Sequence, residues 1–301
     1  MASVARMTGK WWQQEFEEPT QKQLGALAPA AHFSAGKNAE RSLCRALRQA
    51  FQENAFCLFY QPILDLRTDR TIGAETLLRW RKGSEIICAV EFIETLEKSD
   101  LLDTVADWTL REACRNAAWI HRTLKPDFRV AVNVAPQQCA GERLLESVNG
   151  ALKESGCNPR MLDLEITERA CLSDCGSVRA AIKRFRDEGI TVTIDDFGAG
   201  HANFTCLSRF PITHLKIDKY YCRHSKAQSK VLGPIIAAAH RAGITCTAEG
   251  VETAAQLRQL KLSGCDEAQG FKIARPMDLE SLVNFLKGQP LSDAWRYRHA
   301  S

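Results

Sequence analysis

The sequence predicts an α/β protein that folds as a TIM-like (β/α)8 barrel with an antiparallel first strand. From Leu43 onward, short runs rich in Val, Ile and Leu alternate with longer segments of helical period, which is typical of βα units around a parallel sheet. The segment from Leu43 to Leu286 spans about 240 residues, close to the roughly 250 of a barrel of this kind.

Eight candidate strands follow one another along the chain: Cys57–Ile63, Ile72–Leu78, Phe128–Val134, Met161–Ile166, Ile190–Asp195, Thr213–Asp218, Ile244–Glu249 and Ala268–Ile273. The candidate helices are a stretch with Val105, Trp108, Ala113, Ala117, Ile120 and Leu124 on one face, and the segments Leu145–Leu152, Val178–Phe185, Val231–Ala239 and Ala254–Leu260. Four helical segments meet a glycine that can cap the last turn: Gly156, Gly189, Gly243 and Gly264. The short turn at Thr68–Arg70 between the first two strands favours one antiparallel pair.

The chain divides into three parts by its hydrophobic pattern. Residues 1–42 have no sustained period and are predicted to form a poorly ordered N-terminal tail. Residues 43–287 form the predicted barrel, and residues 288–301 form a C-terminal tail. We expect the folded part to be a single domain.

Composition limits the classes of protein that fit this chain. A hydrophobic content of 45% and a charged content of 25% are those of an ordinary globular protein. The net charge of +4 is too small to indicate a nucleic-acid binder by itself. No apolar run is long enough to cross a bilayer and the first residues lack a signal-peptide core, so we expect a cytoplasmic protein. The 12 cysteines have no CxxC spacing and are interpreted as buried hydrophobes rather than disulfides or a zinc site.

Polar or charged residues lie near the carboxyl ends of seven predicted strands. They are Glu75, Asn133, Glu165, Asp195, Lys216, Glu249 and Gln269. In a closed parallel barrel these side chains converge on one mouth, which is where the active sites of such barrels lie. Any one of the acids can instead cap the helix that follows it, but this explanation does not account for all seven together.

Crowded carboxylates at this mouth would repel one another unless a positive charge lies among them. Lys216 alone cannot neutralise Glu75, Glu165, Asp195, Asp196 and Glu249. Mg²⁺ and Mn²⁺ prefer carboxylate and amide oxygens, so the sequence predicts one of these cations here. The adjacent Asp195 and Asp196 make a site for two ions plausible, and such sites typically serve phosphoryl transfer.

Two further residue types bear on the chemistry. Arg79, four residues after Glu75, is suited to forked recognition of phosphate, and the alternative is a surface arginine packed on Trp80. The histidines form no HxH or HxxxH pair, and His201 and His214 are interpreted as local hydrogen-bonding residues.

The set of motifs resembles the EAL-domain phosphodiesterases, which hydrolyse the bacterial second messenger cyclic di-GMP to linear pGpG. The naming motif corresponds to Glu75-Thr76-Leu77 within GAETLLRW. The other blocks are YQPILDL at 60–66, NVA at 133–135, LEITE at 164–168, IDDFGAG at 194–200, LKID at 215–218, AEGVET at 248–253 and QGF at 269–271. Together these blocks run from residue 60 to residue 271 in the expected order.

The resemblance implies a role for each matching residue. Glu75, Asn133, Glu165 and Asp195 would bind one metal ion, and Asp195, Asp196 and Glu249 would bind a second. Lys216 would position the nucleophilic water and, with Glu249, help to remove its proton. Together with the metal ligand Glu75, these two residues are the expected catalytic residues. Gln61, Arg79 and Gln269 would contact the substrate, while Glu168 and Glu252 would support the ligands. The implied reaction is in-line attack of metal-bound water on one phosphodiester, and the implied assembly is a homodimer.

The sequence departs from the family pattern in several places. Thr76 replaces the usual alanine of the naming motif, and Phe271 and Arg275 replace a tyrosine and a lysine. The loop reads GAGHANF where GTGYSSL is common, with the changes at Ala199, His201, Ala202 and Asn203. We therefore keep a second hypothesis, a weak or inactive receptor of this fold that binds cyclic di-GMP or a protein. A third, a nucleic-acid regulator, rests only on the basic residues near Arg296 and is not favoured.

Overall fold

The structure is a computed structural model that describes residues 37–126, 128–139, 142–167, 176–198, 210–222 and 226–288. These residues form two compact units. The first contains the described residues up to Cys57 together with Arg79–Leu102, and the second contains Leu58–Leu78 together with the described residues from Asp103 onward. The predicted tails, apart from residues 37–42 and Gly288, lie outside the described residues.

A closed ring of eight strands forms the second unit's sheet. The strands are β1 (Phe56–Asp65), β2 (Arg70–Lys82), β4 (Arg129–Val134), β5 (Leu162–Thr167), β6 (Thr191–Phe197), β7 (His214–Ile217), β8 (Thr245–Ala248) and β9 (Glu267–Ala268). They pair in the order β1-β9-β8-β7-β6-β5-β4-β2, and β1 pairs with β2 to close the ring. Strand β1 is antiparallel to β9, whereas β2 and β4 through β9 are parallel. The predicted barrel and its antiparallel first strand are confirmed.

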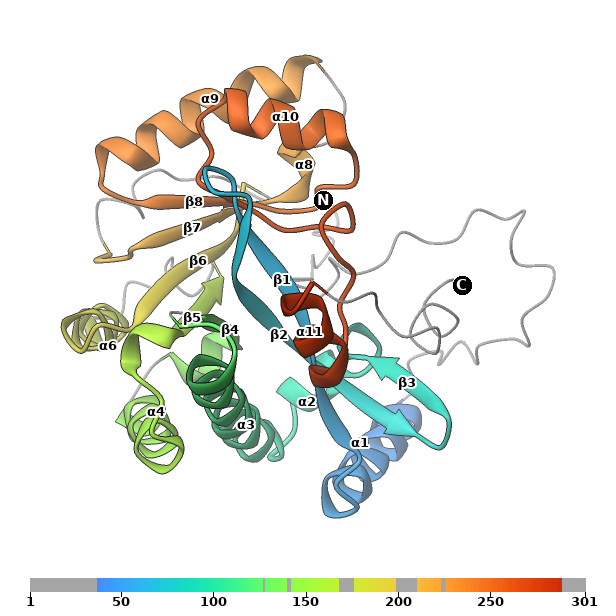
Figure 1. Ribbon diagram of the computed structural model, residues 1–301. Helices are drawn as coiled ribbons and strands as arrows, with labels where there is room; N and C mark the ends of the chain where they lie inside the picture. Colours follow the sequence, from blue (N-terminus) through green and yellow to red (C-terminus); the bar gives the residue numbers. More distant parts are fainter. Residues whose placement is uncertain are drawn as a thin grey trace, which may run out of the picture. The chain divides into compact units, whose positions relative to one another are not determined.

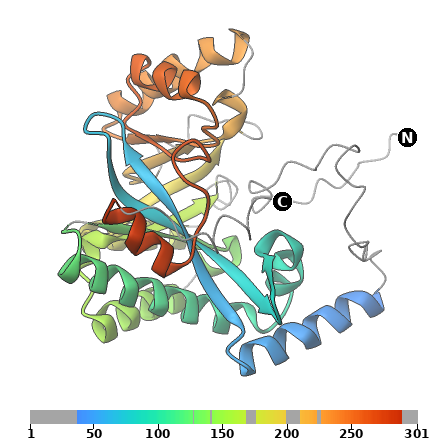
Figure 2. The same ribbon diagram turned by 45° about the vertical axis from the view of Figure 1, so that its right-hand side comes forward.

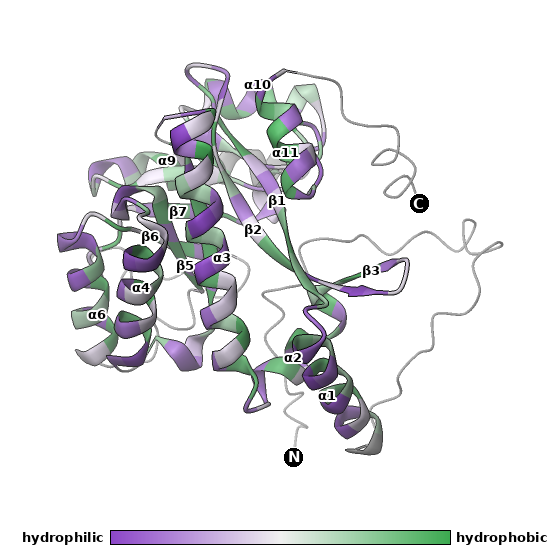
Figure 3. Ribbon diagram, turned by 60° about the horizontal axis from the view of Figure 1, so that its bottom comes forward, coloured by the Kyte–Doolittle hydropathy of each residue, from purple (hydrophilic) through white to green (hydrophobic). Residues whose placement is uncertain are grey.

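Amphipathic helices cover the outside of this ring. They are α3 (Leu102–Thr123), α4 (Glu142–Ser155), α6 (Gly176–Asp187), α8 (Lys219–Cys222), α9 (Lys226–Arg241), α10 (Ala254–Leu262) and α11 (Leu279–Leu286). Helices α4 and α6 lie outside β4–β6, and α9 and α10 lie outside β7 and β8 (Figures 1 and 2). Hydrophilic and hydrophobic residues alternate along α3, α4 and α6, as helices with one packed face require (Figure 3). The four predicted glycine stops all have positive φ, between 65° and 88°.

The first unit is a small assembly that the sequence pattern did not predict. Helix α1 (Lys37–Gln52) begins before residue 43, so the predicted boundary of the tail falls inside a helix. The end of β2 pairs with β3 (Glu85–Cys88), and the helix α2 (Ile93–Glu97) follows. The Trp80 ring meets the edge of the Phe92 ring at 6.1 Å between centroids, and Phe92 also packs against Phe56. These rings give the unit a core of its own.

The last strand is shorter than the sequence predicts. The predicted strand Ala268–Ile273 is wrong beyond Ala268, where β9 ends. Gly270 has φ of 155°, and a Cβ there would lie 2.2 Å from the Val251 nitrogen, so the backbone turns through a space that only glycine can occupy. The chain then returns as a turn, in which the Ile273 nitrogen donates to the Gly270 carbonyl oxygen.

A layer of buried polar side chains fills the barrel near the amino ends of its strands. The Arg129 guanidinium on β4 donates to the Glu267 carboxylate on β9, with one contact at 3.0 Å. Glu267 also accepts from the Thr247 hydroxyl at 2.8 Å, and Asp163 accepts from the Thr193 hydroxyl at 2.7 Å. Because β4 and β9 are not neighbours in the sheet, the Arg129–Glu267 contact crosses the interior of the ring. It joins strands that the backbone ladder does not join directly, whereas the two hydroxyl hydrogen bonds link the neighbouring pairs β8–β9 and β5–β6.

No helix among the described residues has both the length and the apolar composition needed to cross a bilayer. The described helices are instead amphipathic or short, in agreement with their place around the barrel.

Gly73 makes room for the Arg129 side chain, and we predict that Gly73→Ala destabilises the protein by about 1–3 kcal/mol. A Cβ at this position would lie 2.6 Å from the Arg129 carbonyl oxygen and 2.7 Å from its Cγ, so the buried pair would have to shift. Urea unfolding measures the effect. Gly176→Ala is the matched control, because a Cβ at this exposed first residue of α6 meets nothing within 4 Å and its helix should be unchanged or slightly stabilised. Equal stability of Gly73→Ala and the parent protein would contradict this role.

Candidate functional site

The seven strand-end residues converge at the carboxyl mouth of the barrel. Glu75 lies on β2, Asn133 on β4, Glu165 on β5, Asp195 on β6 and Lys216 on β7, while Glu249 and Gln269 directly follow β8 and β9. The parallel register places Asn133 beside Glu165, so these side chains start from the same level of the barrel. Glu165, Asp195, Glu249 and Gln269 each lie two positions after a residue of the lower polar layer, and residues two apart on a strand share a face. The predicted convergence is confirmed.

Lys216 is the centre of this cluster. Its Nζ lies 3.2 Å from Glu75 Oε2, 3.1 Å from Glu165 Oε2, 3.3 Å from Asp195 Oδ1 and 2.5 Å from Glu249 Oε1. The Lys216 side chain is only 3% exposed, so water screens these contacts very little. One ammonium group therefore holds carboxylates from four different strands or strand ends.

A second set of hydrogen bonds orients Glu75. The Asn133 amide donates to Glu75 Oε1 at 2.9 Å, and the Gln269 amide donates to Glu75 Oε2 at 2.6 Å. Gln269 also donates to Gln61 Oε1 at 2.8 Å, and Gln61 donates to the Ala274 carbonyl oxygen at 3.3 Å. Both oxygens of Glu75 are thereby fixed in direction, and the predicted substrate residues Gln61 and Gln269 are part of the same buried network.

Burial and mutual repulsion raise the pKa of most of these carboxyl groups. Burial raises the pKa of Asp196 to about 10, with added repulsion from Asp195 and Glu249. Burial also raises the pKa of Glu249 to about 8, in spite of the attraction of Lys216. The pKa of Glu165 is raised well above its usual value by burial and by the charge of Glu75. Without a further positive charge, several of these groups would hold a proton near neutral pH.

Glu75 and Lys216 are the exceptions and remain charged. Burial acts to raise the pKa of Glu75, but attraction to Lys216 and the amide hydrogen bonds outweigh it and lower the pKa. Burial acts to lower the pKa of Lys216, but the surrounding carboxylates raise it well above its usual value. These two residues form the ionised core of the site.

Asp195, Asp196 and Glu249 form a group that is suited to a divalent cation. One carboxylate oxygen from each residue lies within 4.8 Å of the others. Asp196 has a φ of 57°, a left-handed conformation that aspartate tolerates and that turns its side chain away from the strand direction. Among the described residues, neither oxygen of Glu249 accepts a well-directed hydrogen bond, although Oε1 lies near Lys216. Buried oxygens without donors, in an all-oxygen set, fit Mg²⁺ or Mn²⁺.

The remaining predicted residues are placed less directly. Arg79 is buried and belongs to the first unit, so its role in binding phosphate stays a prediction. Glu252 is exposed in the turn before α10, where its backbone nitrogen donates to Gln256 Oε1 at 2.8 Å. Glu168 and the altered loop positions from Ala199 to Asn203 lie outside the described residues.

Thr167 is a residue of the site region that the sequence analysis missed. It ends β5, two positions after Glu165, and its hydroxyl oxygen is buried without a hydrogen-bond partner among the described residues. The register places it beside Asp195. Because residues two apart on a strand point to the same face, its spacing from Glu165 could have predicted its place near the site.

The chain belongs to the EAL domain family, because the model of that family matches residues 44–276. Family membership therefore accounts for both the barrel fold and the cluster of carboxylates at its mouth. The matched residues include every described residue of the cluster around Lys216.

Several known proteins are similar to this chain. "Cyclic di-GMP phosphodiesterase PA2567" of Pseudomonas aeruginosa is 36% identical over 253 residues, which are 82% of this chain and 43% of that protein. "Cyclic di-GMP phosphodiesterase NbdA" of the same organism is 34% identical over 245 residues, which are 80% of this chain and 31% of that protein. This chain thus spans less than half the length of these relatives.

A solved structure shares the fold. The structure described as "PaMucR Phosphodiesterase, c-di-GMP complex" superposes with a TM-score of 0.75 at 33% sequence identity, and the match covers 80% of this chain and 99% of that one. The match over nearly the whole of that chain shows that the barrel of this protein is an EAL domain in structure as well as in sequence.

Replacing the central ammonium should destabilise the protein, and the effect should grow with pH. With chelator present, we predict that Lys216→Met lowers the free energy of unfolding by about 3–5 kcal/mol at about pH 8, because buried carboxylates lose their partner. Removing the ammonium raises the carboxyl pKa values above those of the unfolded chain, so the folded variant binds extra protons and its stability falls as pH rises.

Urea unfolding at about pH 5.5 and about pH 8 checks the prediction, with a smaller deficit expected at the lower pH. Lys183→Met is the matched control, because Lys183 is 68% exposed and pairs with Asp187 on its own helix. A deficit in Lys216→Met that is no larger than in the control, or that shrinks with rising pH, would show that Lys216 does not hold the cluster together.

Proposed function

We propose that this protein hydrolyses cyclic di-GMP to linear 5′-pGpG in a reaction that depends on Mg²⁺ or Mn²⁺. The observation that carries the proposal is the cluster of four buried carboxylates around Lys216, with the half-buried Asp196 beside them, at the mouth of an EAL barrel. Membership of a family with relatives named as cyclic di-GMP phosphodiesterases supports the choice of substrate. The homodimer expected from the family resemblance stays a prediction.

Two groups of oxygen donors are the proposed cation ligands. Glu75, Asn133, Glu165 and Asp195 would hold one ion, and Asp195 would share the second with Asp196 and Glu249. Bound cations of this class polarise a phosphoryl oxygen and help to deprotonate water, and a pair of them screens the charge of the leaving oxygen. The raised carboxyl pKa values support this assignment, because cations would take the place of the protons that now limit repulsion.

Lys216 and Glu249 are placed to handle the nucleophilic water. Their charged ends are 2.5 Å apart, so a water held by the ammonium would lie within reach of the carboxylate. With cations bound in place of the protons, Glu249 would be ionised and able to accept a proton from this water. Lys216, with its strongly raised pKa, would remain charged and stabilise negative charge that develops on the phosphate.

Gln61 and Gln269 are the proposed substrate contacts within the second unit. Both are buried at the mouth, and the side-chain amide oxygen Oε1 of Gln269 has no hydrogen-bond partner among the described residues. An amide acceptor of this kind can receive a hydrogen bond from a bound ligand. Arg79 remains the proposed phosphate contact on the grounds of its chemistry.

The purified full chain should convert cyclic di-GMP to pGpG with Mg²⁺ or Mn²⁺ present. Chromatographic separation of the nucleotides measures the conversion. Excess chelator should abolish it, and renewed addition of either cation should restore it, because the proposed reaction needs a divalent cation held by the all-oxygen donor set. Stoichiometric binding of cyclic di-GMP without any pGpG would instead support the receptor hypothesis.

Glu75→Gln should lower turnover at least about a hundredfold, because the substitution removes a charge from the ionised core of the site while it preserves side-chain volume. Steady-state rates at saturating cation measure the loss, and circular dichroism checks that the barrel is intact. Glu280→Gln is the control, since Glu280 is an exposed acid in the first turn of α11. Unchanged turnover in Glu75→Gln would remove Glu75 from the site.

A further inference from the structure

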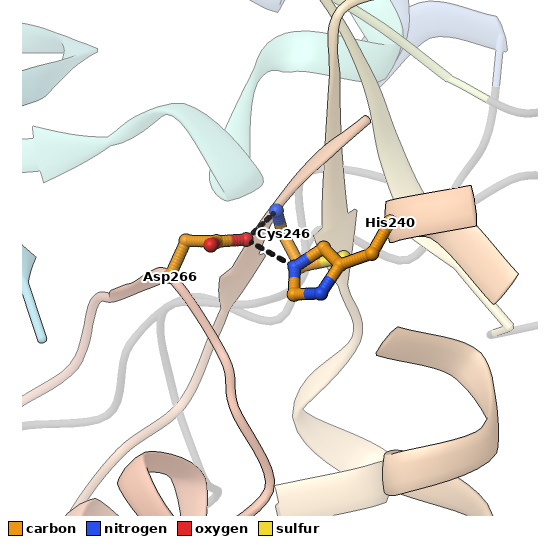
Figure 4. A group of neighbouring side chains, drawn as sticks. All are labelled: His240, Cys246 and Asp266. Carbon is orange, nitrogen blue, oxygen red and sulfur yellow. Dashed lines mark hydrogen bonds and ion pairs between the residues drawn. The ribbon is translucent and has the colours of Figure 1, made fainter. Parts of the chain in front are cut away.

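A second group of metal-binding side chains lies on the outer side of β8, away from the catalytic mouth. His240 is near the end of α9, Cys246 is on β8 and Asp266 directly precedes β9, and the three side chains point toward one another (Figure 4). One potential ligand atom from each lies within 4.8 Å of the others. Cys246 is near the amino end of β8, whereas Glu249 follows its carboxyl end, so the two groups belong to opposite ends of the same strand.

Existing contacts already hold two of these side chains together. Asp266 Oδ2 lies 2.8 Å from His240 Nε2 and accepts a hydrogen bond from the Cys246 backbone nitrogen at 2.8 Å (Figure 4). Two ligands that are each about 2.0–2.2 Å from one ion lie roughly 3 Å apart, so the nitrogen and the oxygen have a separation that suits a shared cation. Cation binding would require little movement of His240 and Asp266.

Cys246 supplies the third donor from the interior. Its side chain is fully buried, and in the part of the chain that the structure describes its thiol donates no hydrogen bond. The His240 and Asp266 side chains are 41% and 38% exposed. The sulfur donor therefore lies on the buried side of the group, and the nitrogen and oxygen donors lie on the side that solvent reaches. A cation could enter from solvent, and a water could complete its coordination.

We propose that His240, Cys246 and Asp266 form a separate binding site for a borderline divalent cation of the zinc class. Nitrogen, thiolate sulfur and carboxylate oxygen are the donors that Zn²⁺ prefers, whereas the catalytic mouth offers only oxygen to a cation. The sequence gives no sign of this site, because its donors are separated by 6 and 20 residues and come from a helix, a strand and a loop.

Binding must release one proton from the thiol. Burial raises the pKa of Cys246 to about 12, so the thiol is protonated in the metal-free protein. On binding, the thiol proton passes to solvent, the sulfur becomes a thiolate ligand, and His240 binds through a neutral ring nitrogen. Affinity should therefore increase with pH, and the site is independent of the proposed phosphodiesterase activity.

The test uses the full chain, reduced and freed of metal, in the presence of excess Mg²⁺ to saturate oxygen-only sites. We expect one tightly held Zn²⁺ per chain, and with Co²⁺ we expect the absorption band of a thiolate ligand. His240→Gln should weaken Zn²⁺ binding at least about tenfold, since loss of a direct ligand costs at least as much as loss of its supporting partner. Cys246→Ala should abolish the Co²⁺ band.

Cys139→Ala is the matched control, because Cys139 is a buried thiol outside the group and its loss should leave both signals unchanged. His240 is partly exposed, so His240→Gln tests the site even where a change at the buried Cys246 disturbs folding. Failure of the parent protein to hold Zn²⁺ stoichiometrically, or equal Zn²⁺ affinity of His240→Gln and the parent, would overturn the proposal. So would a Co²⁺ band that persists in a folded Cys246→Ala variant.

Discussion

The structure depends on the electrostatic balance at the mouth of the barrel, where Lys216 holds carboxylates from four strands or strand ends in a nearly dry environment. Like charges at this spacing raise one another's pKa, and a single ammonium cannot offset five of them. Such an arrangement is costly for stability and is typical of a functional site. The same surplus of negative charge that strains the metal-free protein provides the donors for divalent cations.

The lower polar layer explains how the barrel keeps this cluster in position. The Arg129–Glu267 pair crosses the interior from β4 to β9. Arg129 lies four residues before Asn133 and Glu267 two residues before Gln269, and both of these amides donate to Glu75. Burial acts to lower the pKa of Arg129, whose side chain is 14% exposed, but attraction to Glu267 and Asp163 outweighs it and raises the pKa. Among the described residues Arg129 pairs with two acids, Glu267 and Asp163, whereas Lys216 in the upper layer contacts four. The lower layer is thus closer to charge balance, and the upper layer is a site that can take further positive charge.

Much of this could be predicted from the sequence because it rests on local pattern and spacing. Apolar strands that end in a polar residue, repeated at the length of one βα unit, predicted both the barrel and the residues that meet at its mouth. The lower layer was missed, although Asp163, Thr193, Thr247 and Glu267 each lie two positions before a site residue. Because alternate residues of a strand point to the same face, these four residues could have been predicted to face the barrel interior below the site.

Other features could not be predicted from local pattern. The first unit, with α1 and β3, depends on ring contacts such as that between Trp80 and Phe92, which no periodicity signals. The end of β9 is set by the approach of Val251 to Gly270, a contact between distant residues that ends the pairing early. The contacts of Lys216 with four acids likewise depend on the closure of the ring and are visible only in three dimensions.

The most direct test of the account is to locate cations in the mouth of the barrel. Crystals of the full chain with Mn²⁺ would be measured at the manganese absorption edge, where anomalous scattering identifies the ion. The account predicts anomalous density among the carboxylate oxygens of Glu75, Asp195 and Glu249, with Lys216 displaced from at least one of its present partners. Full Mn²⁺ saturation with no anomalous density at these oxygens would contradict it.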